Sequence, residues 1–258
     1  CPESRGLGDV YKRQNLFKDM VCYQEEVRDP SRMAEVLNRV IEKAFRGSAP
    51  AQINVPRDYW TQVIDIELPP IVRFERQGGG KEAIENAAKL LSKAKFPVIL
   101  SGAGVVLGGA IDECKKLAEK LDAPVCNGYQ HNDSFPGSHP LAVGPLGYNG
   151  SKAAMELISK ADVVLALGTR LNPFSTLPGY GIDYWPKKAT IIQVDMNPDR
   201  IGLTKKVSVG ICGDAKQVAQ QILDKLSSDA GNSGREERKN LIHKTKSAWL
   251  QTLSGLDH

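Results

Sequence analysis

Long apolar runs and metal-type cysteine spacings are both absent from the sequence. No run approaches the roughly 20 residues that a membrane-spanning helix needs, and the N-terminal residues lack the charged-then-apolar layout of a secretion signal. The five cysteines show no Cys-x-x-Cys spacing, so we expect reduced thiols with no metal or disulfide role. These absences favour a cytoplasmic protein without a membrane partner.

The sequence also lacks a concentration of charge of one sign. Its 34 basic and 30 acidic residues give a formal net charge of +4 and are interspersed along the chain. Such a pattern is typical of a solvated surface and argues against a nucleic-acid partner. Gly-x-Ser-x-Gly, His-Glu-x-x-His and Walker-type loops are missing as well. Their absence removes the usual sequence support for a hydrolase, a metalloprotease or a kinase.

What is present is the composition of an ordinary globular protein. The 258 residues are 41% hydrophobic and 25% charged, with 24 glycines and 15 prolines, which predicts one or two domains. A chain of this length hides roughly 70% of its unfolded surface, so it needs neither disulfides nor a structural metal to hold a core.

The first part of the chain divides into three segments. Residues 1–14 carry no apolar periodicity, and we expect them to be a non-native leader. In residues 15–64 a helix over 31–46 precedes a strand over 51–55, a pattern that indicates the closing edge of a larger α/β sheet. Residues 65–80, rich in proline and glycine, form an expected linker.

Residues 81–227 alternate helices with apolar strands. We expect helices at 83–91, 110–121, 151–160 and 215–226, and strands at 96–100, 124–126, 162–167 and 190–194. Strands that are apolar throughout, joined by helices, predict an α/β fold with a doubly wound parallel Rossmann-like sheet. Between them lies one long polar loop, residues 127–150.

The last part of the chain, residues 228–258, is expected to be another linker. Residues 228–240 are polar and charged, and 241–253 have an amphipathic pattern. The sequence predicts that this amphipathic stretch packs on a surface outside the chain.

Glycines and two charged residues follow the expected strands. Gly102 and Gly104 come after the first strand, Gly168 and Arg170 after a middle one, and Asp195 after a later one. Because carboxyl ends of parallel strands share one edge, and glycine lets backbone amides approach a phosphate, we expect a ligand there. The alternatives are a tight strand-to-helix turn for the glycines, pairing with an aspartate for Arg170, and a turn or cap for Asp195.

The long loop is rich in polar side chains but shows no catalytic spacing. Tyr129, His131, Asp133 and His139 do not combine a nucleophile, a base and an orienting partner. Two histidines eight residues apart with one aspartate between them are more often hydrogen-bonded loop residues than metal ligands. We therefore assign no metal site.

The order of these segments resembles the thiamine-diphosphate-dependent enzymes. The stretches that carry the resemblance are SAPAQINVPRD (48–58), PVILSGAG (97–104), LAVGPLGYNG (141–150), ADVVLALGTR (161–170) and IQVDMNP (192–198). The resemblance covers about residues 15 to 253. It implies that 15–64 end a pyrimidine-binding domain and that 81–227 form the central Rossmann-like domain.

Three longer stretches are similar to one acetyl-transferring branch of that family. They are FKDMVCYQEE (17–26), GYQHND (128–133) and NPFSTLPGYGIDYW (172–185). This similarity implies a cytoplasmic, homo-oligomeric enzyme of taurine and organosulfonate breakdown. Its expected reaction converts sulfoacetaldehyde and phosphate to acetyl phosphate and sulfite, with thiamine diphosphate and Mg²⁺ as cofactors.

The resemblance also implies that parts of the catalytic centre lie elsewhere. In the family the activating glutamate precedes the position of Phe17, and the Gly-Asp-Gly metal motif follows that of His258. We therefore expect a fragment, assign no catalytic residue and no metal ligand, and predict that the isolated chain is inactive.

In related synthases the central domain holds a flavin or adenine nucleotide. The corresponding loops here are 102–104, 147–151 and 168–170. The candidate cofactor-binding residues are therefore Gly102, Gly104, Gly147, Asn149, Gly150, Gly168, Arg170 and Asp195. In other relatives this domain is an empty brace between catalytic domains, and the sequence leaves open whether FAD, ADP or nothing binds.

Three alternatives remain beside this interpretation. One is the central domain of another thiamine-diphosphate enzyme, such as an acetolactate synthase-like protein. Another is a free-standing nucleotide-binding domain close in fold to NAD-dependent deacylases, although the paired cysteines of a zinc ribbon are missing. The third is a non-enzymatic assembly module that packs against partner chains.

Overall fold

The computed structural model describes residues 14–47, 49–70 and 75–255. The chain divides into two compact units, residues 1–74 and 75–258, and each is described by itself. The leader expected at 1–14 lies outside the described residues except for Gln14, whose carbonyl accepts a hydrogen bond from Gln24. In the part of the chain that the structure describes, no helix combines the length and apolarity that crossing a bilayer requires.

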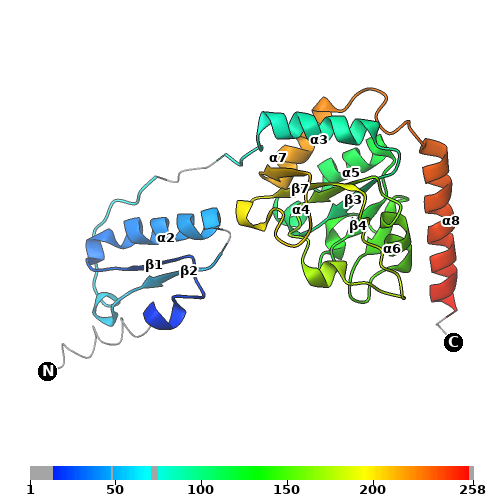
Figure 1. The fold of residues 1–258 in the computed structure, drawn as a ribbon. Coiled ribbons are helices and arrows are strands. Elements are labelled where there is room, and N and C mark those ends of the chain that lie inside the picture. The colour runs from blue at the N-terminus through cyan, green and yellow to red at the C-terminus, as the bar shows by residue number, and fades with distance from the viewer. Residues whose placement is uncertain (1–13, 48, 71–74, 256–258) are drawn as a thin grey trace. The chain divides into compact units, whose positions relative to one another are not determined.

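The smaller unit is a single β-α-β crossover. Strands β1 (Tyr23–Glu26) and β2 (Ala51–Asn54) pair in parallel, and helix α2 (Met33–Gly47) connects them (Figure 1). Its small core is built on Val27, Val36 and Val40. The helix and the second strand match their predicted ranges closely. Ahead of the first strand Met20 is 59% exposed, and the strand starts at Tyr23.

The larger unit holds a six-stranded sheet in which every pair is parallel. Its order is β5-β4-β3-β6-β7-β8. The strands are β3 (Pro97–Ser101), β4 (Val125–Asn127), β5 (Ala142–Pro145), β6 (Val163–Leu167), β7 (Thr190–Asp195) and β8 (Val209–Cys212). The chain runs outward from β3 in one direction and from β6 in the other. This confirms the doubly wound sheet and sets its topological switch point between β3 and β6.

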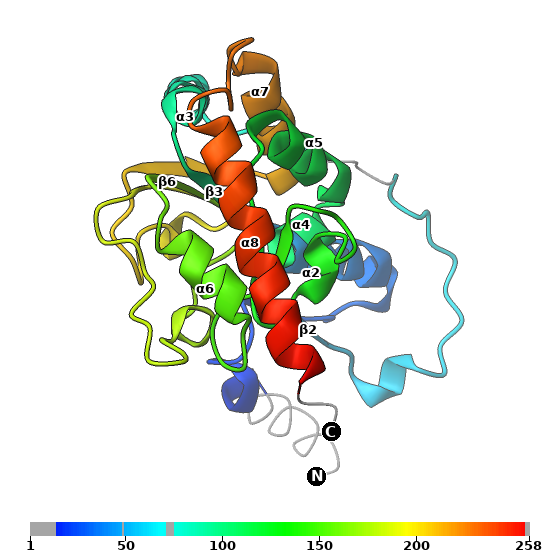
Figure 2. The same ribbon diagram turned by 90° about the vertical axis from the view of Figure 1, so that its right-hand side faces the viewer.

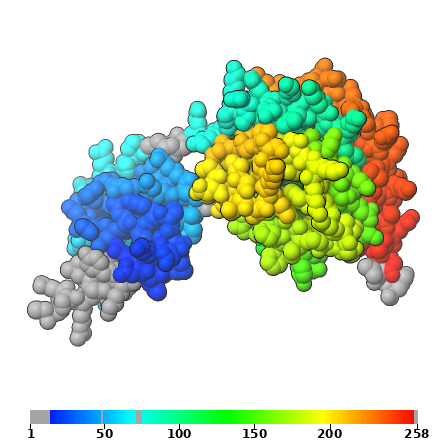
Figure 3. Space-filling view, in the orientation of Figure 1, coloured from blue at the N-terminus to red at the C-terminus, as the bar shows by residue number. Residues whose placement is uncertain are grey.

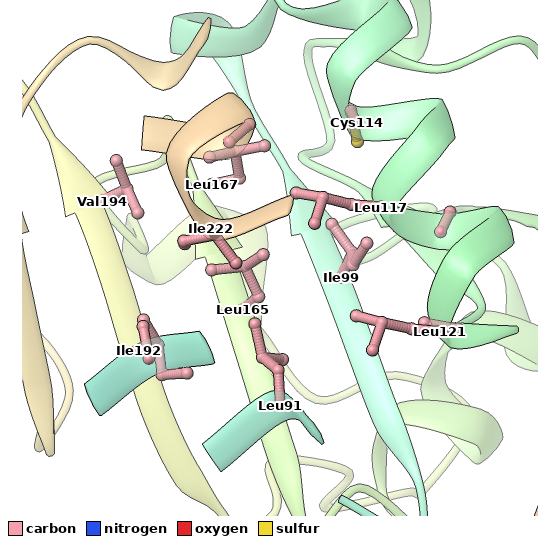
Figure 4. Close-up of a cluster of buried hydrophobic side chains, with 14 of the residues drawn as sticks. Leu91, Ile99, Cys114, Leu117, Leu121, Leu165, Leu167, Ile192, Val194 and Ile222 are labelled. Atoms are coloured by element: carbon pink, nitrogen blue, oxygen red, sulfur yellow. The ribbon is translucent and has the colours of Figure 1, made fainter. Parts of the chain in front are cut away.

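Helices cover both faces of this sheet. Alternate strand residues face opposite sides, so Ile99 and Leu165 join one buried cluster while Val98 and Val164 join the other. Figure 4 shows the first cluster, in which strand residues meet Leu91, Leu117 and Ile222 from three helices. Those helices are α3 (Lys81–Lys93), α5 (Ile111–Leu121) and α7 (Ala215–Lys225), whereas α6 (Lys152–Ile158) covers the other face. A short helix, α4 (Ala103–Leu107), follows β3 directly.

Two strands differ from the sequence expectation. The stretch 127–150 is not one continuous loop, because β5 lies within it and forms one edge of the sheet. At the other edge, β8 was not predicted at all. Both are four residues long, and Gly144 or Gly210 interrupts the apolar pattern in each.

The C-terminal part also differs from the linker expected at 228–258. Residues Arg235–Ser254 form one helix, α8, which runs beside α6 in Figure 2. The amphipathic stretch at 241–253 therefore has its packing surface within this chain, where Ile242 joins the buried cluster under α6.

Candidate functional site

The turns after β3 and β6 meet at the switch point of the sheet. The amide of Gly102 donates to the carbonyl of Leu167 at 3.1 Å, and that of Gly104 donates to the carbonyl of Gly168 at 2.8 Å. A Cβ added at Gly104 would lie 2.6 Å from the Cα of Gly168, so the two turns touch backbone to backbone. Close packing therefore accounts for these three glycines, and the Gly104 amide is used within the protein.

A second turn lies after β5. Gly147 has φ +85°, and a Cβ there would lie 2.1 Å from the carbonyl oxygen of Phe174. The amide of Tyr148 donates to the same carbonyl at 3.2 Å. Asn149 has φ +53°, and the carbonyl of Gly150 accepts a hydrogen bond from the Tyr180 hydroxyl at 3.0 Å. The candidate segment 147–150 thus lies against the loop that follows β6.

One row of contacts joins this segment to the switch point. The amide of Gly128, after β4, donates to the carbonyl of Ser101 at the end of β3. The next residue, Tyr129, has its ring centroid 6.4 Å from that of Phe174. Most of the candidate glycines therefore lie along the same carboxyl edge, as parallel strands require.

Arg170 is an exposed cation at this edge. Its side chain is exposed, and within residues 14–47, 49–70 and 75–255 no hydrogen bond or ion pair engages its guanidinium. Among those residues Arg170 forms no ion pair with an aspartate, which was the alternative expected from the sequence. An unpaired guanidinium at a sheet edge suits an anionic ligand group.

The backbone beside Arg170 is held in an unusual conformation. Leu171 is fully buried with φ +53°, a region that residues other than glycine adopt only when their surroundings enforce it. Its amide donates to the Thr169 hydroxyl at 3.2 Å, and its carbonyl accepts from the Thr204 hydroxyl at 2.8 Å. The strain is therefore maintained by the loop after β7, which carries Thr204.

Asp195 acts as a turn residue. It is 8% exposed, and its Oδ1 accepts a hydrogen bond from the amide of Asn197 at 2.8 Å. This is the Asx turn that was one of the two roles open for it. The other role, accepting hydrogen bonds from ribose hydroxyls, stays a prediction.

Sequence reasoning missed two buried polar groups that shape this edge. Gln193 donates to the carbonyls of Thr169 and Arg200 and accepts from the amide of Gly202, so it ties the loops after β6 and β7 together. In the space-filling view those two segments, coloured yellow, lie against each other (Figure 3). The available signal was a lone amide side chain within the apolar strand TIIQVD.

The second missed group is a hydrogen-bonded cluster at the ends of β3 and β4. The hydroxyls of Ser101 and Ser134 lie 2.7 Å apart, and the amide nitrogen of Asn127 donates to Ser134 at 2.9 Å. The cluster fixes the start of the long loop, and its members are all buried.

The histidines of the long loop have local partners. His139 Nε2 lies 3.2 Å from a carboxylate oxygen of Glu119, and its Nδ1 accepts from the amide of Leu141. His131 Nδ1 lies 4.0 Å from Asp133. Over the described ranges no group of three metal-ligating side chains comes together.

Two buried thiols and one buried phenol of the larger unit are poorly suited to proton transfer or nucleophilic attack. Burial raises the pKa of the Cys114 thiol to about 12 and also raises the pKa of Cys126. Burial likewise raises the pKa of Tyr184 to about 12, against a smaller opposing effect of the Gly147 backbone. The edge therefore offers backbone turns, aromatic rings and the exposed Arg170, a set suited to binding.

The family description "Thiamine pyrophosphate enzyme, central domain" matches residues 84–222. The chain is 79% identical over 243 residues to the "Probable sulfoacetaldehyde acetyltransferase" of Rhizobium meliloti (strain 1021), covering 94% of this chain and 41% of that protein. It is 78% identical over 242 residues to the "Sulfoacetaldehyde acetyltransferase" of Roseovarius nubinhibens, covering 94% of this chain and 40% of that protein.

A more distant relative is the "Probable acetolactate synthase large subunit" of Methanocaldococcus jannaschii, 33% identical over 249 residues, with 93% of this chain and 40% of that protein covered. Among solved structures, benzoylformate decarboxylase from Polynucleobacter necessarius matches with a TM-score of 0.69 at 22% identity, covering 83% of this chain and 40% of that one. The chain thus spans about two fifths of the length of the curated relatives it matches.

Proposed function

Because the chain belongs to the thiamine pyrophosphate enzymes, whose central domain it contains at residues 84–222, we propose that it forms the central part of a sulfoacetaldehyde acetyltransferase. The observation that carries this proposal is the 79% identity to the Rhizobium protein over 94% of the chain. The whole enzyme would convert sulfoacetaldehyde and phosphate to acetyl phosphate and sulfite.

The role of this part is to support the catalytic centre and not to supply it. Thiamine diphosphate contributes carbanion chemistry in such enzymes, whereas the protein binds, orients and stabilises charge. The residues described here do not fit that cofactor with Mg²⁺. No set of three metal-ligating side chains is found among them, and the buried Asp195 already uses one carboxylate oxygen in a turn. No catalytic step is therefore assigned to any residue of this chain.

For the carboxyl edge we propose an adenine nucleotide or flavin as ligand. The switch point between β3 and β6, the unpaired Arg170 and the ring of Phe174 support this choice, since they offer an edge, a cation and an aromatic surface. The alternative, an empty brace, is favoured by the Gly104 amide being already bonded to Gly168. We also propose that the whole enzyme is cytoplasmic and homo-oligomeric.

A chain-exchange experiment tests the proposed activity. In the Rhizobium relative, the region that matches this chain is replaced by residues 15–253, and sulfite release from sulfoacetaldehyde is measured with and without phosphate. We expect phosphate-dependent release of sulfite with an equal yield of acetyl phosphate. A folded hybrid that instead converts only pyruvate would favour the acetolactate synthase-like alternative.

The ligand proposal has its own test. Calorimetric titration with ADP and with FAD is done on the wild-type chain, on Arg170→Ala and on Lys160→Ala, which removes an exposed charge before β6 at the opposite edge. We expect binding that weakens roughly tenfold in Arg170→Ala and is unchanged in Lys160→Ala. No heat from either nucleotide with the wild-type chain would support the empty brace.

A further inference from the structure

Helix α8 is fixed to the larger unit at three points along its length. Near its start, the buried guanidinium of Arg238 donates to five backbone carbonyls. They belong to Lys95, Leu121, Asp122, Gly231 and Ser233. A buried cation that satisfies its donors only with carbonyls of the surrounding loops holds the start of the helix firmly.

The middle of α8 holds the segment just before β5. The ammonium of Lys246 donates to the carbonyls of His139 at 3.3 Å and Pro140 at 2.7 Å. Burial lowers the pKa of Lys246, as expected for an ammonium that has left water. This contact reaches the chain two residues before β5 begins at Ala142.

The last turns of α8 contact the loop that follows β6. The Trp249 ring packs edge-on against the Tyr180 ring, with centroids 5.6 Å apart. Tyr180 has φ +53°, and its hydroxyl donates to the carbonyl of Gly150 at 3.0 Å. Contacts therefore run without interruption from the end of α8 to the candidate segment 147–150.

We propose that α8 is a clamp on the carboxyl edge, with Trp249 and Tyr180 as positioning residues for the segment 147–150. Docking of the helix end orients Tyr180, and the Tyr180 hydroxyl then fixes the Gly150 carbonyl. Any force that lifts the end of α8 loosens this segment first, while Arg238 keeps the start of the helix in place. The use of this device for ligand binding rests on the proposed nucleotide site, whereas the clamp itself does not.

Hydrogen exchange followed by mass spectrometry measures the clamp without any ligand. The reporters are the amides of Tyr148, Gly150 and Ser151, which bond to carbonyls within the edge. The variants are Trp249→Ala, which removes the ring contact, Trp249→Phe, which keeps an aromatic ring, and Tyr180→Phe, which removes only the hydroxyl. Leu250→Ala is the matched control, since Leu250 is an exposed neighbour on the same helix.

We expect Trp249→Ala and Tyr180→Phe each to speed exchange at residues 146–151 roughly 3- to 10-fold. Trp249→Phe should restore most of the protection, Leu250→Ala should change nothing, and both β6 and residues 235–245 should keep wild-type exchange in every variant. Unchanged exchange at 146–151 in Trp249→Ala would overturn the clamp. An equal rise in β6 would also overturn it, because that marks general destabilisation.

The clamp proposal and the nucleotide-site proposal can be refuted independently of each other. If the wild-type chain binds neither ADP nor FAD while the exchange pattern is as expected, the nucleotide proposal is wrong and the clamp stands. If nucleotide binds but Trp249→Ala leaves the segment protected, the clamp is wrong and the nucleotide proposal stands.

Discussion

At the residue scale, the switch point depends on how closely two backbones approach. Gly104 and Gly168 lie on adjacent turns, and no side chain fits between them because a Cβ on either would lie within 2.7 Å of the other's Cα. The sequence placed these glycines correctly at the edge. It did not reveal that the amides of Gly102 and Gly104, which a phosphate would need, both donate to backbone carbonyls within the protein.

Substituting Gly104 therefore tests the packing explanation. Gly104→Ala is expected to lower the free energy of unfolding by about 1–3 kcal/mol, because the added methyl forces the two turns apart. The control is Gly80→Ala, where the structure has open space around the added Cβ. Urea unfolding of both variants measures the difference, and equal stabilities would show that the turns can separate at no cost.

A second prediction at this scale concerns the reactivity of the buried thiols towards an alkylating reagent. Cys114 and Cys126 are fully buried with raised pKa values, whereas Cys22 is exposed. Treatment with iodoacetamide at pH 8 should modify Cys22 in the native chain and reach Cys114 and Cys126 only after unfolding. Peptide mass spectrometry identifies the sites, and rapid native modification of Cys126 would contradict the described core.

Tyr184 makes a third prediction, on pH dependence. Its pKa is raised to about 12 from an ordinary value of 10.0, so the folded chain favours the neutral phenol. The resulting stabilisation is complete below pH 10 and is lost as the pH rises through about 12. Tyr184→Phe should flatten the alkaline loss of stability, because phenylalanine has no hydroxyl to ionise.

The matched control for Tyr184 is Tyr148→Phe. Tyr148 is 57% exposed, so removal of its hydroxyl should leave the alkaline slope of the unfolding free energy unchanged. Identical slopes for the wild-type chain and Tyr184→Phe between pH 10 and 12 would contradict the link between burial and titration.

At the scale of elements, the hydrophobic pattern predicted the strands that are buried through apolar side chains. It missed the helix whose buried side chains are mostly polar. PVILS and VVLAL are apolar throughout, and both are central strands as predicted. Helix α8 was missed because two of its three buried residues, Arg238 and Thr245, are polar. The guanidinium finds carbonyls contributed by residues more than 110 positions away, and no local pattern records such partners.

The edge strands were missed for a different reason. In β5 the apolar pattern breaks at Gly144 and Pro145, and β8 contains an exposed Gly210 between buried neighbours. Whether a short edge segment forms a strand depends more on pairing with the neighbouring strand than on its own composition.

Limited proteolysis compares the resistance of the two units to cleavage. In its described residues the smaller unit has a two-stranded sheet covered by α2, too little for independent stability, whereas the larger unit has six strands covered on both faces. Trypsin should cleave first between Lys18 and Arg57 and leave a resistant core that begins near residue 81 and includes α8. Equal survival of both units, seen by mass spectrometry, would contradict this order.

At the scale of the whole molecule, we propose a supporting role for this chain. The family match covers residues 84–222 as a central domain, and the described residues offer a parallel sheet but no metal-ligand cluster. The fold could be predicted from the alternation of elements and the family from short motifs. The orientation of the polar groups at the edge could not, because it depends on contacts between loops that follow different strands.

Turnover by this chain alone tests most directly whether the chain supports a catalytic centre without supplying one. Purified residues 1–258 are incubated with sulfoacetaldehyde, phosphate, thiamine diphosphate and Mg²⁺, and sulfite and acetyl phosphate are quantified beside the active Rhizobium relative. We expect no product above the protein-free control, together with weak or no calorimetric binding of thiamine diphosphate. Production of acetyl phosphate by the chain alone, or a micromolar dissociation constant for the cofactor, would contradict it.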